Sequence, residues 1–563
     1  MFGLAKAPKE PLSDARSAER WLASFAATDP LAAHAALLDE LARAAEPDAH
    51  RKPGALEALF VADAYARDMR RVLCAQYIEH ASRSGKIEHQ LWQALFDLTQ
   101  AFLVAYGTFE RDVIDQDPDP RWHALLPELL AREMLHLACD AKLRMFRYEP
   151  WIPGKWAELH QRFTLACTRR IERERLMLRG ESNPVTIEHI YIVVLALQLA
   201  NAGNLSRSQI DWLATQFDDW CSSLRLSVSS PGASAFYVDV TQRVGLRRRT
   251  AAPLEGQVLF LDTDPLHAIL QHYIMAIEQK VRQQPLSPKT ARRVERLTLL
   301  TKVAAQIDSQ FRPVERRGER TVAVGKVDAL VGLNNICGYM REEAAPAHEM
   351  DSVTTYSGTL DIALFGHLRN EHERRKELRR RRFAAFGTPG GPWEMKDVSM
   401  TGLRVTAPME AATTVTLGML VALRMQGDLV WTLGVVRRMR RVTAERAEIG
   451  LQRIADSVSV VDIAAQRQGE ADYAVDGESV RDRRFRGLFL VLRQANRASA
   501  VHSLVLPAVE YAPGRRYRMT TSTTSYPMRC GTLIEQEPEW VWVSVDPVSL
   551  AAAKPVPAAA AGD

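Results

Sequence analysis

The spacing of the hydrophobic residues changes along this chain, and that change constrains the fold more than any other feature of the sequence. From about Asp14 to Leu226, alanine and leucine recur at intervals of three and four residues, which is typical of helices with one apolar face. After Phe383, short β-rich runs are separated by glycine, proline and other turn residues. Because 563 residues are too many for one compact core, the sequence predicts several domains of different class.

The N-terminal part is predicted to be all-helical. In the segment 56–82, residues spaced three or four apart share one face of a helix: Leu59, Ala62, Ala66, Met69, Leu73 and Tyr77. Several segments of this kind follow one another, separated by proline and glycine. They indicate either a helical-repeat-like array or an irregular bundle, and no fixed repeat period decides between the two.

Shifts in composition predict six segments, and the predicted fold class is multidomain α+β with a β-barrel in the C-terminal part. The segments are a helical domain (1–226), a mixed α/β segment (227–343), a hinge and basic linker helix (344–382), a β-barrel (383–465), an additional β-rich segment (485–546) and a disordered tail (547–563). The additional β-rich segment is either an extension of the first barrel or a separate one.

Charge, cysteines and hydropathy restrict the class of protein. Lys plus Arg number 73 and Asp plus Glu 68, and the net charge of +5 is too small to indicate a nucleic-acid binder by itself. The six cysteines are scattered without CxxC spacing, as expected for reduced thiols. Met1–Leu12 lacks the apolar core of a signal peptide, and the longest apolar run, Ile190–Ala202, has only about 13 residues. The sequence therefore predicts a cytoplasmic protein without a transmembrane segment.

Motifs that carry catalytic chemistry are missing from the sequence. It contains no P-loop, no GxGxxG and no HExxH. Asp262, Asp264 and His267 form a tight group after a β-rich run, so a metal or phosphoryl role stays open there beside the ordinary start of a helix at Pro265. We expect a protein that is not an enzyme, with no catalytic set, no metal site and no cofactor.

The strongest functional signal straddles the start of the predicted barrel. Seven arginines lie between positions 369 and 382: Arg369, Arg374, Arg375, Arg379, Arg380, Arg381 and Arg382. The motif D-x-S-x-x-G follows at 397–402, and a later β-rich run, 449–454, contains Gly450. An arginine pair and a spaced third arginine, followed by D-x-S-x-x-G in a strand–turn–strand, resembles the PilZ domain.

The resemblance covers roughly residues 370–465 and implies a six-stranded barrel that binds cyclic di-GMP. Three arginines match the R-R-x-x-x-R element of that family, and three further residues match its D-x-S-x-x-G element. The ligand-binding residues that the resemblance implies are Arg374, Arg375, Arg379, Asp397, Ser399 and Gly402. The arginines are expected to hold the phosphates and guanine faces, Asp397 and Ser399 to bond the guanine edges, and Gly402 to shape the turn through a positive φ.

These residue types suit the chemistry of a cyclic dinucleotide. The planar guanidinium group of arginine pairs bidentately with a phosphate or with the O6 and N7 atoms of guanine, and it also stacks on the base. Short polar side chains in the turn accept N–H groups, and a glycine permits close approach of a ligand. The arginine segment and the turn can therefore contact one ligand from two sides.

The leading hypothesis is a bacterial cyclic di-GMP receptor in which the barrel senses the nucleotide. Ordering of the arginine segment would relay binding to residues 1–226, which would bind an unidentified protein partner. Two alternatives stay open. One is a ligand-free scaffold whose barrel docks a protein partner. The other, less favoured, is a nucleic-acid-binding regulator that uses residues 369–382 and the triplet Arg247–Arg249.

Overall fold

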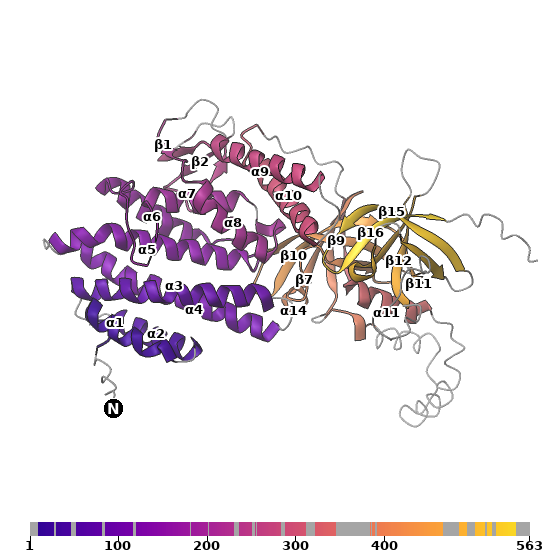
Figure 1. Cartoon of the computed structure of the whole chain (residues 1–563), viewed down its shortest axis with the longest axis horizontal. Helices are drawn as coiled ribbons and strands as arrows, with labels where there is room; N and C mark the ends of the chain where they lie inside the picture. Colours follow the sequence, from indigo (N-terminus) through magenta and orange to yellow (C-terminus); the bar gives the residue numbers. More distant parts are fainter. Residues whose placement is uncertain are drawn as a thin grey trace, which may run out of the picture. The chain divides into compact units, whose positions relative to one another are not determined.

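The computed structural model divides the chain into two compact units, Met1–Glu315 and Arg316–Asp563 (Figure 1). The residues that it describes are 10–27, 30–46, 52–80, 85–115, 120–180, 182–200, 202–229, 236–249, 254, 256–282, 288–310, 321–344, 383, 385–388, 391–428, 430–465, 484–492, 501–512, 515–520 and 525–547. The six finer boundaries that composition suggests stay predictions.

The first unit begins with a set of helices, as the hydrophobic spacing predicts. They are α1 (Ala15–Ala23), η1 (Ser24–Ala27), α2 (Pro30–Ala44), α3 (Pro53–His80), α4 (Gly85–Asp115), α5 (Pro120–Met145), α6 (Pro153–Arg169), α7 (Ile187–Leu199), η2 (Ala202–Asn204) and α8 (Arg207–Trp220). Helix α5 packs against α3, α4, α6, α7 and α8. In a repeat array each element contacts only its neighbours, so these helices form a bundle around α5.

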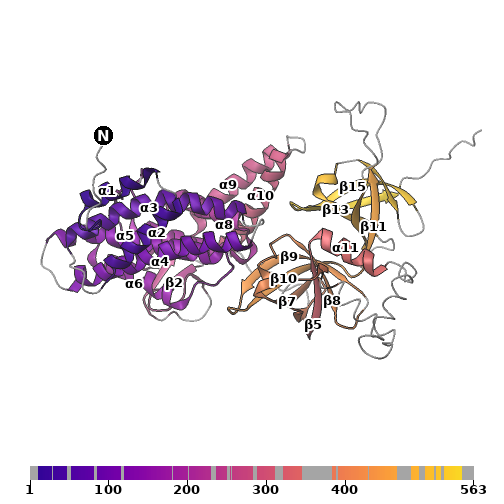
Figure 2. The same ribbon diagram turned by 90° about the horizontal axis from the view of Figure 1, so that it is seen from below.

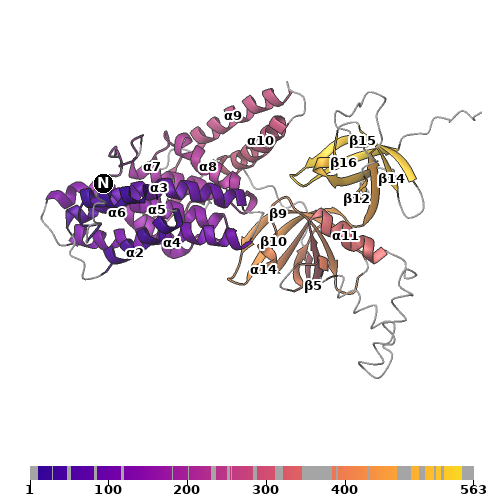
Figure 3. The same cartoon turned by 60° about the horizontal axis from the view of Figure 1, so that its bottom comes forward.

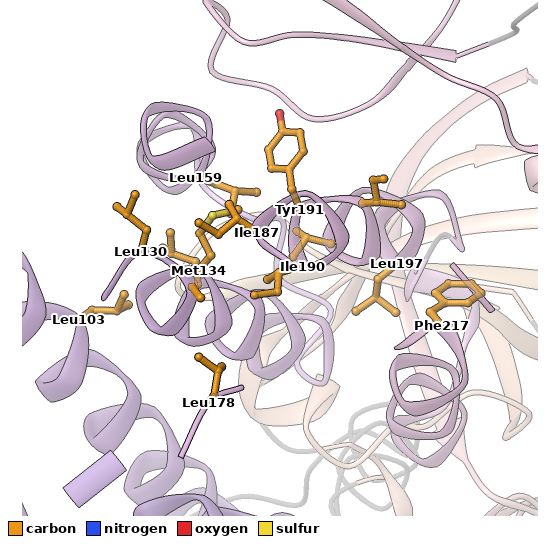
Figure 4. Close-up of a cluster of buried hydrophobic side chains, with 14 of the residues drawn as sticks. Leu103, Leu130, Met134, Leu159, Leu178, Ile187, Ile190, Tyr191, Leu197 and Phe217 are labelled. Carbon is orange, nitrogen blue, oxygen red and sulfur yellow. The ribbon is translucent and has the colours of Figure 1, made fainter. Parts of the chain in front are cut away.

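The core of the bundle lies between α5 and the helices around it. Leu130 and Met134 of α5 face Ile187 and Ile190 of α7, and all four side chains are buried (Figure 4). Helix α7 buries residues all around its circumference, which is typical of a helix in the middle of a core. Thr186 caps its start by accepting a hydrogen bond from the backbone N–H of His189 at 3.1 Å.

Charged side chains are also buried on α5, and each has a partner on the same or a neighbouring helix. Arg132 donates from Nη1 to Asp63 of α3 at 2.9 Å, and Glu133 accepts from Nε of Arg162 at 3.0 Å. Burial lowers the pKa of His136 to about 4, so that the neutral ring contacts Asp63. Breaking a buried pair of this kind leaves an unpaired charge and costs about 3–5 kcal/mol, so the pairs fix how the helices pack.

A small sheet and a helical hairpin complete the first unit. The strands β1 (Leu226–Ser227), β2 (Phe236–Asp239), β3 (Arg247–Arg248) and β4 (Val258–Leu261) pair in the order β1-β4-β2-β3. Helices α9 (Asp264–Arg282) and α10 (Pro288–Ile307) pack on each other. The mixed α/β middle that the sequence predicts is confirmed.

The second unit contains two closed β-barrels of six strands each (Figure 2). The first barrel consists of β5 (Thr321–Val331), β6 (Trp393–Val398), β7 (Gly402–Pro408), β8 (Leu420–Met425), β9 (Thr432–Arg441) and β10 (Arg446–Ala455). The second consists of β11 (Val458–Ala465), β12 (Arg484–Leu492), β13 (Val501–Pro507), β14 (Arg516–Thr520), β15 (Ser525–Gln536) and β16 (Trp540–Pro547). The predicted multidomain α+β class is confirmed, and the additional β-rich segment belongs to a separate barrel.

The two barrels share one topology. The strand order is β10-β7-β6-β5-β8-β9 in the first barrel and β16-β13-β12-β11-β14-β15 in the second. In each barrel the first three strands pair in sequence, the last three do the same, and the third strand pairs with the sixth. The first strand, β5, precedes the arginine segment in the sequence, and β6 follows it.

Helix α11 (Leu333–Ala344) and one shared core join the two barrels. This helix packs against β5 and β8 of the first barrel and against β11 and β12 of the second (Figure 3). Among the described residues of this unit, two further short helices are α14 (Met409–Ala412) and η4 (Ala508–Glu510). Trp540 of β16 donates from Nε1 to the carbonyl oxygen of Gly418 at 2.9 Å, and Arg437 of β9 pairs with Glu537 at 3.2 Å. The second barrel therefore contacts the first through the residues just before β8 and through β9.

None of the helices in the described part of the chain is both long enough and apolar enough to cross a membrane.

Candidate functional site

The D-x-S-x-x-G motif occupies the tight hairpin between β6 and β7. The backbone N–H of Ser399 donates to the carbonyl oxygen of Gly402 at 2.7 Å, and its Oγ donates to the same oxygen at 3.2 Å. Arg453, next to this hairpin in β10, donates its backbone N–H to the carbonyl oxygen of Thr401 at 3.0 Å. The turn is therefore closed by the motif's own serine and held by a neighbouring strand.

Gly402 does not have the backbone conformation that the resemblance implies. It is not among the glycines with a positive φ, so that expectation is wrong. The physical reason is that Gly402 is already the first residue of β7, where it pairs with Gln452 of β10 in extended backbone. An added Cβ would lie 3.4 Å from both the Leu451 carbonyl oxygen and the Ser399 Oγ, which is ordinary van der Waals contact.

Asp397 lies near the end of β6 with its carboxylate bound to an arginine that sequence reasoning missed. Its Oδ2 accepts a hydrogen bond from Nε of Arg404 at 2.6 Å, and Nη2 of the same guanidinium group also contacts Oδ2. Arg404 extends further to Glu448 of β10, with Nη1 3.4 Å from Oε2. Arg404 lies two residues after Gly402, so period-two spacing places both on the same face of β7. This spacing is the sequence pattern that could have identified Arg404 as part of the site.

Four residues in register form a row across the outward face of four strands. Asp397 of β6 is paired with Arg404 of β7, which is paired with Gly450 of β10, which is paired with Arg438 of β9. The alternating residues Val405 and Ile449 are buried inside the barrel. Because side chains alternate along a strand, Arg404, Gly450 and Arg438 face outward, and the Asp397 carboxylate is buried against the guanidinium group of Arg404.

Gly450 leaves a gap in this row between two guanidinium groups. A Cβ at this position would lie 3.3 Å from the Cβ of Arg438, which is a tight contact. A planar base can lie flat on backbone that carries no side chain, and arginines on either side can stack on it or pair with a phosphate. The row therefore combines a buried carboxylate, a flat outward surface at Gly450 and two cations on adjacent strands.

Only half of the predicted ligand-binding residues lie in the part of the chain that the structure describes. It brings Asp397, Ser399 and Gly402 together in one hairpin, whereas Arg374, Arg375 and Arg379 are outside the described residues. After these arginines, the described chain resumes beside α11, where the ring of Phe383 lies 5.9 Å from that of Tyr339.

The other sequence candidates have structural roles. Asp262 accepts the backbone N–H of Asp264 at 3.0 Å, at the start of α9, and the described residues contain no cluster of three or more side chains that could hold a metal ion. Arg248, the middle of the basic triplet, donates to the carbonyl oxygens of Gln306 and Asp308 at 3.2 and 3.0 Å. It closes the C-terminal end of α10 and stacks 4.5 Å from the ring of Phe236, which removes it from the set available to a nucleic acid.

A cavity that the sequence did not indicate lies where α11 begins. It has a volume of about 740 Å³, and its lining includes Gly332 and Asn334 from the start of α11, Thr414 from the first barrel, and Pro507 and Glu539 from the second. Asp397, Ser399 and Gly402, the predicted ligand-binding residues that the structure describes, do not line it.

Comparison with known proteins identifies similarity in both units. Residues 16–232 match the family model described as the N-terminal domain of the cyclic-di-GMP receptor FimW. The chain is 23% identical over 445 residues to the cyclic-di-GMP receptor FimW of Pseudomonas aeruginosa, and the match covers 71% of each chain. Because 71% of this chain is longer than the first unit, the similarity extends into the unit that contains the barrels. The chain is therefore similar, over its helical domain and most of its length, to a protein named as a cyclic-di-GMP receptor.

Proposed function

We propose that this protein is a cyclic di-GMP receptor whose first barrel is PilZ-like and binds the nucleotide on its outward face. The observation that carries the proposal is the row Asp397–Arg404–Gly450 beside the closed D-x-S-x-x-G hairpin. The name of the Pseudomonas aeruginosa relative supports the same ligand. We propose binding, not catalysis, as the role of this site, and a cytoplasmic location belongs to the proposal.

In this proposal the arginine segment and the D-x-S-x-x-G hairpin contact different parts of the ligand. Asp397 and Ser399 accept the N–H groups on the edge of one guanine, and the gap at Gly450 receives a base. Arg374, Arg375 and Arg379 hold the phosphates and guanine faces with their planar guanidinium groups. The helical unit, which matches the FimW N-terminal family model, transmits the bound state to a protein partner.

Calorimetric titration of the full-length protein with cyclic di-GMP tests this proposal, with GTP as the control ligand. We expect saturable binding that the double variant Arg375→Ala, Arg379→Ala abolishes. A matched control, Arg516→Ala with Arg518→Ala, removes two exposed arginines from the second barrel and should leave binding unchanged. Tight binding by the Arg375/Arg379 variant would contradict the arginine assignment, and no binding by the folded wild-type protein would contradict the receptor function.

A further inference from the structure

We propose that Arg404 is a positioning residue that orients the Asp397 carboxylate for the guanine edge, and that Glu448 in turn fixes Arg404. This inference rests on the proposed function of the outward face. Nothing in the D-x-S-x-x-G motif itself includes Arg404, which lies two residues beyond its glycine, or Glu448, which lies on a different strand.

The contacts of Arg404 converge on one oxygen of the carboxylate. Both Nε, at 2.6 Å, and Nη2 approach Oδ2 of Asp397. A contact of two nitrogens with one oxygen restricts rotation of the carboxylate about its last bond, and so determines where Oδ1 lies. The remaining nitrogen, Nη1, lies 3.4 Å from Oε2 of Glu448. Arg404 is thus held from β6 and from β10 at the same time.

Because Asp397 is more buried than Arg404, Asp397 depends on this ion pair more than Arg404 does. The side chain of Asp397 is 7% exposed and that of Arg404 is 40% exposed. An ionised carboxylate removed from water needs a cation and hydrogen bonds nearby, whereas a half-exposed guanidinium group keeps much of its hydration. Arg404 therefore holds the buried carboxylate of Asp397 in one orientation, while its own exposed edge borders the surface on which the ligand lies.

The chemistry of the bases converts this orientation into selectivity. Guanine offers N–H donors at N1 and at its 2-amino group, both of which an oriented carboxylate accepts. Adenine places an unprotonated, accepting nitrogen at N1 and has no 2-amino group, so the same carboxylate repels its edge. Loss of Arg404 should therefore weaken binding of cyclic di-GMP more than binding of cyclic di-AMP.

The test uses full-length protein titrated with cyclic di-GMP and with cyclic di-AMP. Arg404→Met keeps the aliphatic stem and removes the charge, and we expect it to weaken cyclic di-GMP binding about tenfold to hundredfold, as for loss of a charged hydrogen bond. Arg404→Lys, which keeps the charge, should recover part of that loss. The double variant Asp397→Asn, Arg404→Met should bind no more weakly than Asp397→Asn alone, because Arg404 acts through Asp397. Arg518→Ala in the second barrel is the control for charge removal.

Each outcome decides the question. Wild-type affinity in Arg404→Met, an equal loss for both dinucleotides, or effects of Asp397→Asn and Arg404→Met that simply add would overturn the inference. Failure of the wild-type protein to bind cyclic di-GMP would instead overturn the proposed function, and this inference with it. If Arg404→Met does not fold, the variant Glu448→Gln tests the inference in its place. It should weaken binding about threefold to tenfold as Arg404 loses its second anchor, and unchanged affinity would reject the inference.

Discussion

The two barrels of the second unit have the same strand order but different outward faces. The hairpin between β6 and β7 contains D-x-S-x-x-G, and its neighbours complete a row of charged and glycine positions. The corresponding connection in the second barrel, residues 493–500, reads Arg-Gln-Ala-Asn-Arg-Ala-Ser-Ala and lacks the motif. The topology therefore provides a scaffold, and a few residues on its strands distinguish the barrel that we propose binds a nucleotide from the one that lacks the motif.

The two barrels also differ in the polar side chains that they bury on corresponding strands. Arg424 of β8 is 3% exposed, pairs with Glu343 of α11 at 2.8 Å and stacks 4.2 Å from the ring of Trp431. The corresponding strand of the second barrel, β14, instead buries Tyr517, whose hydroxyl donates to the carbonyl oxygen of Glu510 at 2.7 Å. The buried cation of the first barrel is therefore paired with a carboxylate of α11, a helix outside the barrel. The buried hydroxyl of the second barrel has its acceptor on η4, between two strands of that barrel.

The largest effect on stability should come from Arg424→Met. The variant leaves Glu343 and Asp328 without their buried cation and removes the stacking on Trp431, so we expect the first barrel to lose about 3 kcal/mol. Tyr517→Phe is the matched change in the second barrel and should cost about 1 kcal/mol. Hydrogen exchange of β8 and β14 in the full-length protein measures both losses, and equal losses would remove the distinction between the two buried polar side chains.

Asp397→Ala should have the next largest effect, which we expect on ligand affinity. The variant removes the acceptor that we propose for the guanine edge, and we expect binding of cyclic di-GMP to weaken about a hundredfold. Asn496→Ala, in the corresponding connection of the second barrel, should leave the affinity unchanged. Calorimetry of the two variants side by side provides the comparison. A loss on Asn496→Ala would show that both barrels contact the ligand.

Gly450→Ala should weaken binding about tenfold while the barrel stays folded. The added Cβ would lie 3.3 Å from the Cβ of Arg438, so it would fill the flat gap in the outward row and displace that arginine by a few tenths of an ångström. Calorimetry measures the affinity, and thermal denaturation serves as the control for folding. Unchanged affinity would mean that no base lies over Gly450.

Trp540→Phe should have the smallest effect, at the junction of the two barrels. It removes the 2.9 Å hydrogen bond to the carbonyl oxygen of Gly418 and keeps most of the aromatic packing, so we expect a loss of about 1 kcal/mol. If the junction is rigid, hydrogen exchange should rise in both barrels. An increase confined to β16 would show that the barrels unfold independently.

The general class of each region could be predicted from the sequence, because helix and barrel spacings are local signals. The pairing of strands could not, because it joins residues far apart in the chain. β5 pairs with β6 across the whole arginine segment, and β11 lies within the predicted first barrel, 383–465, yet pairs with β12 and β14. A period-two pattern identifies a strand without naming its partner.

The hairpin of the candidate site could be predicted from its motif, but the pairing of Asp397 with Arg404 could not. The bulge between Met395 and Asp397 sets the register that brings Arg404 opposite Asp397, and no sequence pattern indicates such a shift. The Arg247–Arg249 triplet is a case in which a sequence pattern indicates a binding surface that the structure does not support. Its middle residue, Arg248, donates to carbonyl oxygens at the C-terminal end of α10.

The separation of β5 from β6 also affects how the chain folds. About sixty residues lie between these two paired strands, against about twenty between β11 and β12, and the longer loop raises the entropic cost of closure by about 1 kcal/mol. Because folding rates fall as paired segments lie further apart in sequence, the first barrel should close more slowly than its twin. During synthesis, β5 and α11 leave the ribosome long before β6, so the half-built barrel exposes an unpaired strand edge for that interval, the state most prone to aggregation.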